Sequence, residues 1–214
     1  YPSIVGGGKN ACILHYRSND AELRGGELML IDAGAEVDGY ATDVTRTSPV
    51  NGRFSPAQRD LYALVLAVQE EACGAVRPGA TLQSIHDEVI RGLSRGLLEL
   101  RLLQGSLDEV IESGSFKRYY MHRTSHWLGL DVHDVGTYQL RDGTTPGDNR
   151  PLAPGMVLTI EPGLYVAPDD ELAPAAFRGI GIRIEDDVLV TERGHENLTI
   201  GTPKSLNDLA ALRR

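Results

Sequence analysis

The stretch MHRTSHWLGLDVHD, residues 121–134, holds three of the six histidines of this 214-residue chain and predicts the site around which the rest is organised. Neutral imidazole is the side chain best suited to bind a transition metal or to move a proton near neutral pH. A single histidine here would be interpreted as a half-exposed polar residue with a backbone partner. Three of them, His122, His126 and His133, bracket an apolar run and predict a functional site with partners elsewhere in the chain.

The composition indicates an ordinary hydrophobic core and an acidic surface. Hydrophobic residues make up 41% of the chain, and the formal net charge is −9. This charge argues against nucleic acid or an anionic membrane surface as the main partner. We find no run of about 18 apolar residues and no charged-then-apolar leader, so we expect neither a transmembrane helix nor a signal peptide. A cytoplasmic location is expected, with Cys12 and Cys73 as reduced thiols and a disulfide between them as the less favoured alternative.

Two segments near the N-terminus predict a β-hairpin that carries two aspartates. Residues 27–34 form a continuous apolar run, which is typical of a strand covered on both faces. Residues 40–47 are rich in β-branched residues and predict the second strand, with a turn at 36–39. The hairpin would bring Asp32 and Asp43 to face each other. The alternative, a helix-capping or turn aspartate, is less favoured because neither residue precedes a helix.

The remaining segments indicate one α+β domain over residues 1–214. Ser55 and Thr81 are expected to cap two amphipathic helices. Strands are expected at residues 12–16 and 156–165, and a strand pair is expected within residues 179–190. Short helical turns are expected at 107–111 and 206–212, a surface loop at 137–154, and a flexible turn that allows close backbone approach at Gly6-Gly7-Gly8. Hairpins dominate the strand connections and no linker divides the chain, which favours α+β over a doubly wound α/β fold.

Four carboxylates close apolar strands: Asp32, Asp43, Glu161 and Glu185. Gathered in one place, they would repel one another severely. Two divalent cations would balance their four negative charges, with His126 as a neutral fifth ligand. Carboxylate-rich ligation with one imidazole suits Mn²⁺, Zn²⁺, Co²⁺ or Fe²⁺, and two metals that share a bridging water are a common hydrolytic arrangement.

These residues and their neighbours resemble the catalytic domain of the pita-bread metallopeptidases, the family of methionine aminopeptidase, aminopeptidase P, prolidase and creatinase. The similar strings are IDAG at 31–34, DVTRT at 43–47, SHWLG at 125–129, EPG at 161–163 and RIED at 183–186. The resemblance implies a curved, mostly antiparallel sheet with helices packed on its outer face. It also implies that the N-terminal domain and the first helix of the family are absent from this chain.

The resemblance further implies a metal ligand set. Asp43 and Glu185 would bridge the two metals, Asp32 would complete one of them, and His126 and Glu161 would complete the other. A metal-bridging hydroxide would attack the scissile carbonyl, with Glu161 also acting as general base and proton shuttle. Mn²⁺ is the expected metal, and Zn²⁺, Co²⁺ and Fe²⁺ are the alternatives.

Four further residues are expected to serve catalysis beside these ligands. His122 and His133 resemble histidines that face the substrate, and His15 matches a histidine near the N-terminal side of the substrate. Arg183 is expected to orient the site carboxylates, because strand alternation places it on the same face as Glu185.

Several neighbouring residues have more than one interpretation. Tyr165 and Trp127 would either wall a proline pocket or serve as ordinary core aromatics. Arg123 occupies a position where several relatives carry a small residue, and it is expected to alter the fit of the substrate. His86 is interpreted as a solvated or capping residue, and His195 is left without a role.

The activity implied by the resemblance is hydrolysis of the N-terminal Xaa-Pro bond in peptides with proline at the second position. The alternative within the same fold is a prolidase, which cuts only the Xaa-Pro dipeptide. A non-catalytic binding module on this fold is a further alternative, disfavoured because all five ligands are present. We expect a homodimer or homotetramer, and no nucleic acid or membrane as partner.

Overall fold

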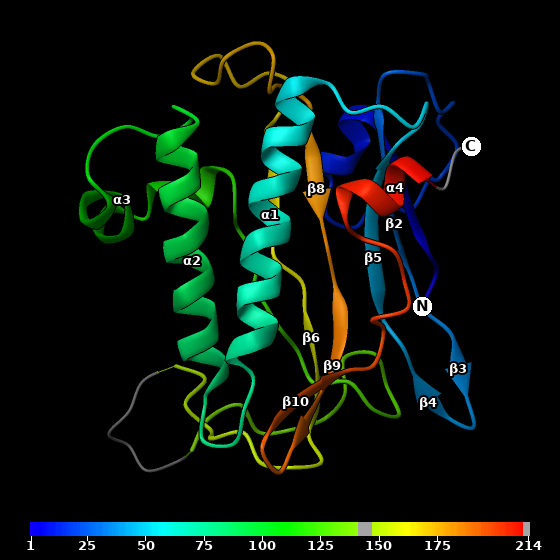
Figure 1. Cartoon of the computed structure of the whole chain (residues 1–214), viewed down its shortest axis with the longest axis vertical. Helices are drawn as coiled ribbons and strands as arrows, with labels where there is room; N and C mark the ends of the chain where they lie inside the picture. The colour runs from blue at the N-terminus through cyan, green and yellow to red at the C-terminus, as the bar shows by residue number, and fades with distance from the viewer. Residues whose placement is uncertain (141–146, 212–214) are drawn as a thin grey trace.

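A computed structural model describes residues 1–140 and 147–211, in which antiparallel strands lie beneath two long helices (Figure 1). The strands are β1 (Ile4–Gly7), β2 (Leu28–Ala33), β3 (Glu36–Val37), β4 (Tyr40–Ala41), β5 (Val44–Pro49), β6 (Val157–Ile160), β7 (Gly163–Tyr165), β8 (Gly181–Arg183), β9 (Asp186–Thr191) and β10 (Gly194–Asn197). The helices are α1 (Pro56–Ala75), α2 (Leu82–Glu99), α3 (Leu107–Ser113) and α4 (Leu206–Ala211), with 3-10 helices η1 (Gly8–Cys12) and η2 (Ser115–Arg118). The expected α+β architecture is confirmed.

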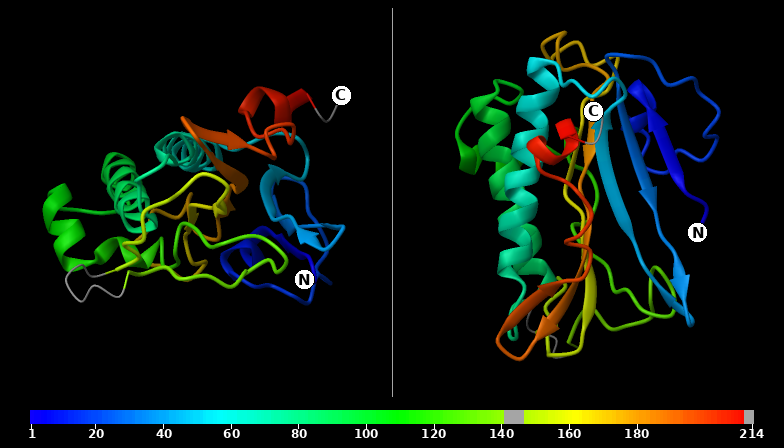
Figure 2. Two further views of the ribbon diagram at one scale, coloured as in Figure 1. Left: turned by 90° about the horizontal axis from the view of Figure 1, so that it is seen from below. Right: turned by 45° about the vertical axis from the view of Figure 1, so that its right-hand side comes forward.

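The strands form two three-stranded sheets and two short hairpins. The first sheet has the order β1-β2-β5 and the second the order β10-β9-β6, while β3 pairs with β4 and β7 pairs with β8. Every ladder in the described part of the chain is antiparallel. Figure 2 shows the first sheet on the side of the second one that is remote from the long helices.

The strand expected at residues 12–16 is wrong. The chain forms β1 at Ile4–Gly7 instead, then turns through η1 and passes residues 13–16 without a strand. Gly8 has a φ of +54°, a conformation that favours glycine and directs the chain out of the strand. The turn expected at Gly6-Gly7-Gly8 is therefore wrong for Gly6 and Gly7, which belong to β1. Only Gly8 adopts a turn conformation.

The hairpin expected at residues 27–47 forms with a different register. Asp32 pairs with Thr45 in the β2–β5 ladder, and Asp43 lies between β4 and β5, outside both strands. The single strand expected over 40–47 is therefore interrupted. Gly34 permits the interruption, because a Cβ at this position would lie 1.9 Å from the carbonyl oxygen of Thr42.

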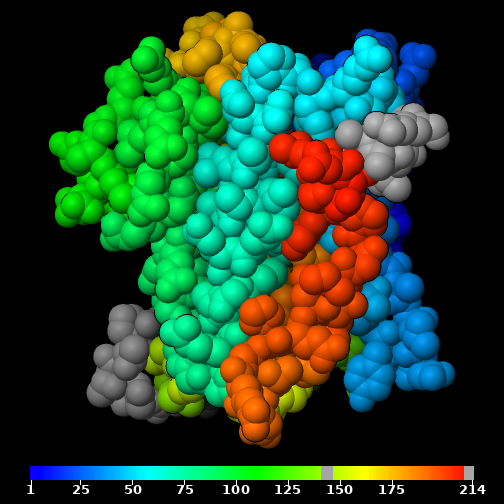
Figure 3. Space-filling view, viewed as in Figure 1, coloured from blue at the N-terminus to red at the C-terminus, as the bar shows by residue number. Residues whose placement is uncertain are grey.

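The two long helices begin where their caps predict. The Ser55 side chain accepts a hydrogen bond from the backbone of Gln58, whose side chain accepts one from the backbone of Ser55, and Thr81 and Ser84 form the equivalent capping box on α2. The apolar sides of α1 and α2 pack on the second sheet and on the β7–β8 hairpin, and with the C-terminal segment they close one face of the molecule (Figure 3). Core side chains at this interface that are at most 1% exposed include Leu61, Val65, Ile85, Leu93, Leu158, Ile182 and Ile184.

In the C-terminal half, the strand expected over 156–165 is divided, whereas the strand pair expected within 179–190 is confirmed as β8 and β9. Glu161 and Pro162 separate β6 from β7, and Ile184 and Glu185 separate β8 from β9. The expected loop over 137–154 contains residues 141–146, which lie outside the described residues, as does the end of the helical turn expected at 206–212.

Cys12 and Cys73 are free thiols, as expected. Within the described ranges, no helix combines the length and apolar character needed to cross a membrane.

Candidate metal centre

All nine side chains expected to form the active site line one cavity of about 570 Å³. The described lining consists of Leu14, His15, Asp32, Asp43, His122, Arg123, Ser125, His126, His133, Tyr138, Asp148, Glu161, Arg183 and Glu185. They come from β2, from the end of β8, from the segment at 121–134, from the three interruptions between strands, and from the loops that hold residues 14–15, 138 and 148. The cavity thus gathers residues that are up to 171 positions apart in the chain, from Leu14 to Glu185.

Three of the carboxylates lie where a strand is interrupted. The backbone N–H of Glu161 donates to the Thr124 carbonyl (2.8 Å), and that of Glu185 donates to the Thr45 carbonyl (3.1 Å). The backbone N–H of Asp43 donates to the Asp187 carboxylate (3.2 Å). These contacts replace the missing ladder bonds, so that each backbone stays satisfied while its side chain is directed into the cavity.

The donor atoms converge closely enough to surround a cation. Asp43, His126 and Glu185 each offer one ligand atom, and these atoms lie within 4.8 Å of one another. Nε2 of His126 lies 3.5 Å from Asp43 Oδ2 and 3.6 Å from Glu161 Oε1. Carboxylate oxygens with one imidazole nitrogen form a donor set that suits the divalent metals expected from the sequence.

Asp32 is held at the edge of this cluster by Arg183. Nη2 of Arg183 donates to Asp32 Oδ2 (2.5 Å), and Nη1 donates to the hydroxyl of Tyr165 (3.1 Å). The hydroxyl of Tyr1 lies 2.7 Å from Asp32 Oδ1 and also contacts a carboxylate oxygen of Asp43, so its single proton serves both aspartates. Tyr1 was missed in the sequence, where a tyrosine at the first position belongs to no motif or periodic pattern.

Burial raises the pKa of three of the four carboxylates, those of Asp32, Glu161 and Glu185. Burial also opposes the charge of Asp43, but hydrogen bonds with His126 and Tyr1 outweigh it and hold the pKa of Asp43 below its ordinary value. Burial raises the pKa of Glu161 to about 7. Burial, and next to it the charges of Glu161, Asp43 and Asp32, raises the pKa of Glu185 well above its ordinary value. The hydroxyl of Thr45 donates to Glu185 Oε2 at 2.5 Å. Bound cations would relieve the repulsion, so the electrostatics of the site also fit a metal centre.

The histidines of the cavity differ in how much of their hydrogen-bonding capacity remains. His122 Nδ1 donates to the Arg123 carbonyl (2.7 Å), and its Nε2 lies 2.9 Å from the hydroxyl of Tyr165. Burial lowers the pKa of His122 to about 4, so this ring is neutral at pH 7. The ring of His133 lies 4.2 Å from that of His126, centroid to centroid, and neither His133 nor the exposed His15 has a hydrogen bond to a described residue.

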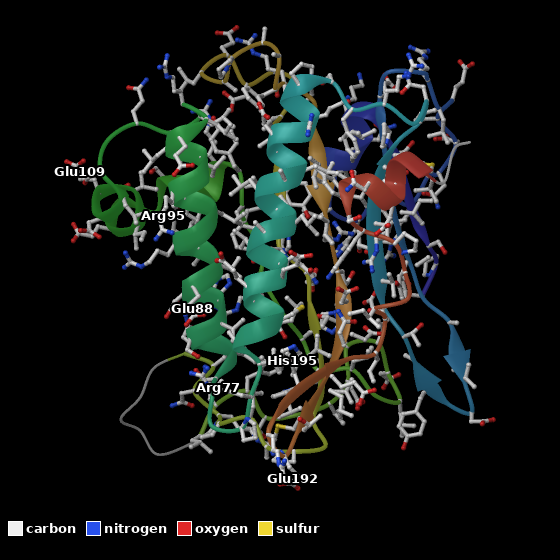
Figure 4. All side chains as sticks on the ribbon, in the orientation of Figure 1. Arg77, Glu88, Arg95, Glu109, Glu192 and His195 are labelled. Carbon is white, nitrogen blue, oxygen red and sulfur yellow. The ribbon has the colours of Figure 1, made fainter. Side chains whose placement is uncertain are left out.

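Other neighbouring residues have structural roles. Trp127 is 7% exposed, packs on Tyr138 and does not line the cavity, which favours its interpretation as a core aromatic. Tyr165 is also buried, but its hydroxyl contacts both His122 and Arg183. His195 lies on β10 near the lower end of α1 (Figure 4), outside the cavity.

The expectation that His86 is solvated or caps a helix is wrong. Its Nδ1 lies 2.8 Å from the hydroxyl of Thr124, and its ring is partly buried against Tyr120. Burial lowers the pKa of His86 to about 4. The signal was present in the sequence, because His86 follows Leu82 by four positions and precedes Val89 by three, within the apolar stripe of the helix.

The chain is similar to known peptidases along almost its whole length. Residues 1–192 match the model of Metallopeptidase family M24. The chain is 51% identical over 212 residues to the Xaa-Pro aminopeptidase of Escherichia coli (strain K12), an alignment that covers 99% of this chain and 46% of that protein. It is 41% identical over 214 residues to the Xaa-Pro aminopeptidase 3 of Homo sapiens, covering 98% and 39%.

Solved structures of aminopeptidases also match this chain over its whole length. Pseudomonas aeruginosa aminopeptidase PepP matches with a TM-score of 0.95 and 51% identity, over 100% of this chain and 47% of that chain. Proline aminopeptidase P II from Yersinia pestis matches with a TM-score of 0.94 and 51% identity, over 100% and 48%. The chain therefore spans about half the length of the relatives that it matches.

Proposed function

Because this chain belongs to metallopeptidase family M24, we propose that it carries the metal centre of an Xaa-Pro aminopeptidase, which removes the first residue from peptides with proline second. The structural matches over the whole chain confirm the pita-bread fold that the sequence resemblance implies. The observation that carries the proposal is the single cavity that collects the four carboxylates and His126. The relatives named as Xaa-Pro aminopeptidases support the choice of substrate.

The donors for two divalent cations would be Asp32, Asp43, His126, Glu161 and Glu185. Mn²⁺ is the metal that we propose, with Zn²⁺, Co²⁺ and Fe²⁺ as alternatives, since the donor set suits all four. Cations held by these residues would polarise the scissile carbonyl and lower the pKa of a bound water.

The residues around the donors supply the proton transfers and the orientation. Glu161 lines the cavity, and its carboxylate would take a proton from the attacking water and pass it to the leaving proline nitrogen. His133, whose ring nitrogens have no partner among the described residues, would donate to the substrate carbonyl. His122 has both nitrogens occupied, so it positions Tyr165 and shields Glu161, from which its Nδ1 is 4.0 Å away.

Arg183 and His15 complete the proposed catalytic set. Arg183 is 4% exposed and fixes the orientation of Asp32 through a charge-assisted hydrogen bond. His15 lies exposed on the cavity wall, where it would contact the N-terminal part of the peptide. A cytoplasmic location and assembly into a dimer or tetramer remain predictions from the sequence.

The test compares metal binding and substrate length in one protein. The Mn²⁺-loaded chain should cleave an Xaa-Pro-Yaa tripeptide, and Asp43→Asn should lose both bound metal and cleavage. Asp38→Asn, in the exposed turn between β3 and β4, is the matched control and should change neither. Cleavage of the Xaa-Pro dipeptide alone would assign the chain as a prolidase, and metal binding without cleavage of any peptide would favour the non-catalytic module.

A further inference from the structure

We infer that Arg123 is a specificity-determining residue at the mouth of the cavity, where its guanidinium binds a carboxylate of the peptide beyond the scissile bond. The inference rests on the proposed function. It concerns the part of the cavity remote from the metal ligands, and it names the chemistry that this part selects: a carboxylate that follows the proline, either the C-terminal carboxylate of a short peptide or an acidic side chain.

The side chains that line the cavity range from nearly buried to exposed, and Arg123 belongs with His15 and His133 to the exposed group. The side chains of Asp32, Asp43, His126 and Glu161 are 8% to 18% exposed, whereas that of Arg123 is 49% exposed. An aminopeptidase holds the free N-terminus of its substrate beside the reacting bond, and the remainder of the peptide has to leave through the open side. Arg123 therefore lies where the residues beyond the proline would pass.

The guanidinium of Arg123 is fixed but only partly used. Its Nη2 donates to Gln83 Oε1 (3.2 Å) and to the carboxylate of Asp148. Asp148 is itself anchored, because its carbonyl accepts the backbone N–H of Gln83 (3.1 Å) in the first turn of α2. A guanidinium has five N–H donors, so those on Nε and Nη1 remain without a partner among the described residues.

The two arginines of the described lining differ in how accessible they are to an anion. Arg183, the other arginine among the described lining residues, is committed to Asp32 with its side chain 5% exposed. Arg123 is therefore the accessible permanent cation there. A substrate carboxylate would accept charge-assisted hydrogen bonds from its free edge without displacing Asp148.

A purely structural role predicts a different result. If Arg123 served only to tie the segment of Asp148 to α2, then removing either partner of the ion pair would have the same effect. If Arg123 binds substrate, Asp148→Asn leaves the guanidinium in place and keeps the preference for a carboxylate, whereas Arg123→Gln loses it. Arg150→Gln is a further control, because Arg150 lies on the same segment but does not line this cavity.

The experiment measures binding by titration calorimetry with the Mn²⁺-loaded full chain. The probes are the dipeptide Pro-Gly and its C-terminal amide, and the amides of Pro-Asp and Pro-Asn, which separate a terminal from a side-chain carboxylate. We expect about tenfold tighter binding of at least one acid than of its neutral counterpart, the effect of one hydrogen bond to a charged group. We expect the ratio to fall to about one in Arg123→Gln and to persist in Asp148→Asn and Arg150→Gln.

Turnover of Ala-Pro-Gly and its amide, measured in parallel, separates the two proposals. Absence of cleavage in the metal-loaded wild type would refute the aminopeptidase, while the calorimetric ratios would still decide the role of Arg123. Equal binding of the acids and their neutral counterparts by the wild type would overturn the inference. A preference that survives Arg123→Gln, or that Asp148→Asn abolishes equally, would overturn it as well.

Discussion

Replacing Asp186 by asparagine should destabilise the protein severely without removing any proposed metal ligand. The Asp186 carboxylate is 0% exposed and accepts five hydrogen bonds. The donors are Arg46 Nη2 (2.6 Å) and Thr199 Oγ1 (2.9 Å) on one oxygen, and Lys204 Nζ (2.6 Å), Asn197 Nδ2 (2.8 Å) and Gln69 Nε2 (2.9 Å) on the other. They connect α1, β5, β10 and the C-terminal segment to β9, directly beside Glu185.

The magnitude follows from the two cations that would lose their counter-charge. The side chains of Arg46 and Lys204 are only 13% and 15% exposed, and an asparagine amide would direct two N–H groups at other donors. Leaving buried charges unpaired in this way costs about 3 to 5 kcal/mol. In a protein of this length, 1 kcal/mol corresponds to roughly 2 to 4 °C, so we expect the thermal midpoint to fall by roughly 6 to 20 °C.

The same carboxylate should impose an acid dependence on stability. Burial opposes the charge of Asp186, but Arg46 and Lys204 outweigh burial and hold the pKa of Asp186 well below its ordinary range. Because the unfolded carboxyl binds its proton at about pH 4 and the folded one only at lower pH, this stabilisation is lost as the pH falls below about 4. Asp186→Asn should lack this component.

Urea unfolding followed by circular dichroism at pH 7 and at a series of acidic pH values would measure both effects. Asp60→Asn is the control, because Asp60 is exposed on α1 without a hydrogen bond or ion pair to a described residue, and its replacement should change stability by less than about 0.5 kcal/mol. A loss of less than about 1 kcal/mol in Asp186→Asn, with an unchanged acid dependence, would refute the assigned role of the network.

Three further predictions concern the surroundings of the cavity. Burial lowers the pKa of His86 to about 4, so between about pH 6.5 and 4 only the unfolded state binds the extra proton. Stability should therefore decrease as the pH is lowered through this window. Unfolding curves of His86→Asn should show a weaker dependence on pH. Gly34→Ala should lower the thermal midpoint and weaken Mn²⁺ binding in calorimetry, because the added Cβ would clash with the Thr42 carbonyl. Gly74→Ala on α1 is the control: its added Cβ would meet no atom within 4 Å, so the protein should become more stable by about 0.5 to 1 kcal/mol. His133→Ala should reduce peptide turnover strongly while elemental analysis finds wild-type metal content, and loss of metal would place His133 among the ligands.

The sequence predicts the helices and the convergence of carboxylates well, because both depend on local signals. A capping serine or threonine before an apolar stripe specifies the start of α1 and α2. A carboxylate at the end of an apolar strand is costly to bury alone, so Asp32 and Glu161 indicate that a partner exists. The family resemblance supplies the identity of that partner, which composition and periodicity do not contain.

The interruptions of the strands and the inner hydrogen bonds were not predictable from these signals. Apolar and β-branched residues flank Asp43 in residues 40–47 and Pro162-Gly163 in residues 156–165, so both segments resemble strands despite these strand-breaking residues. Nothing local shows that the N–H of Glu161 pairs with Thr124 instead of a neighbouring strand. The contact of Tyr1 with two aspartates depends on the whole tertiary arrangement. Residues 12–16 read as a strand because apolar residues predominate, while the conformation that prevents it is set earlier, at Gly8.

The interruptions also determine how the two halves of the chain depend on each other. Asp32 and Asp43 belong to the N-terminal half, whereas Glu161 and Glu185 come from segments more than 100 positions later. The two sheets are separate ladders, joined by side-chain contacts such as those of Arg46 with Asp186 and of the Asp43 N–H with Asp187. An ion shared by these donors would act as a cross-link that closes a long loop, in the manner of a disulfide. Loss of metal would then lower the stability of the fold as well as abolish catalysis, because the cross-link between the two halves of the chain would be lost.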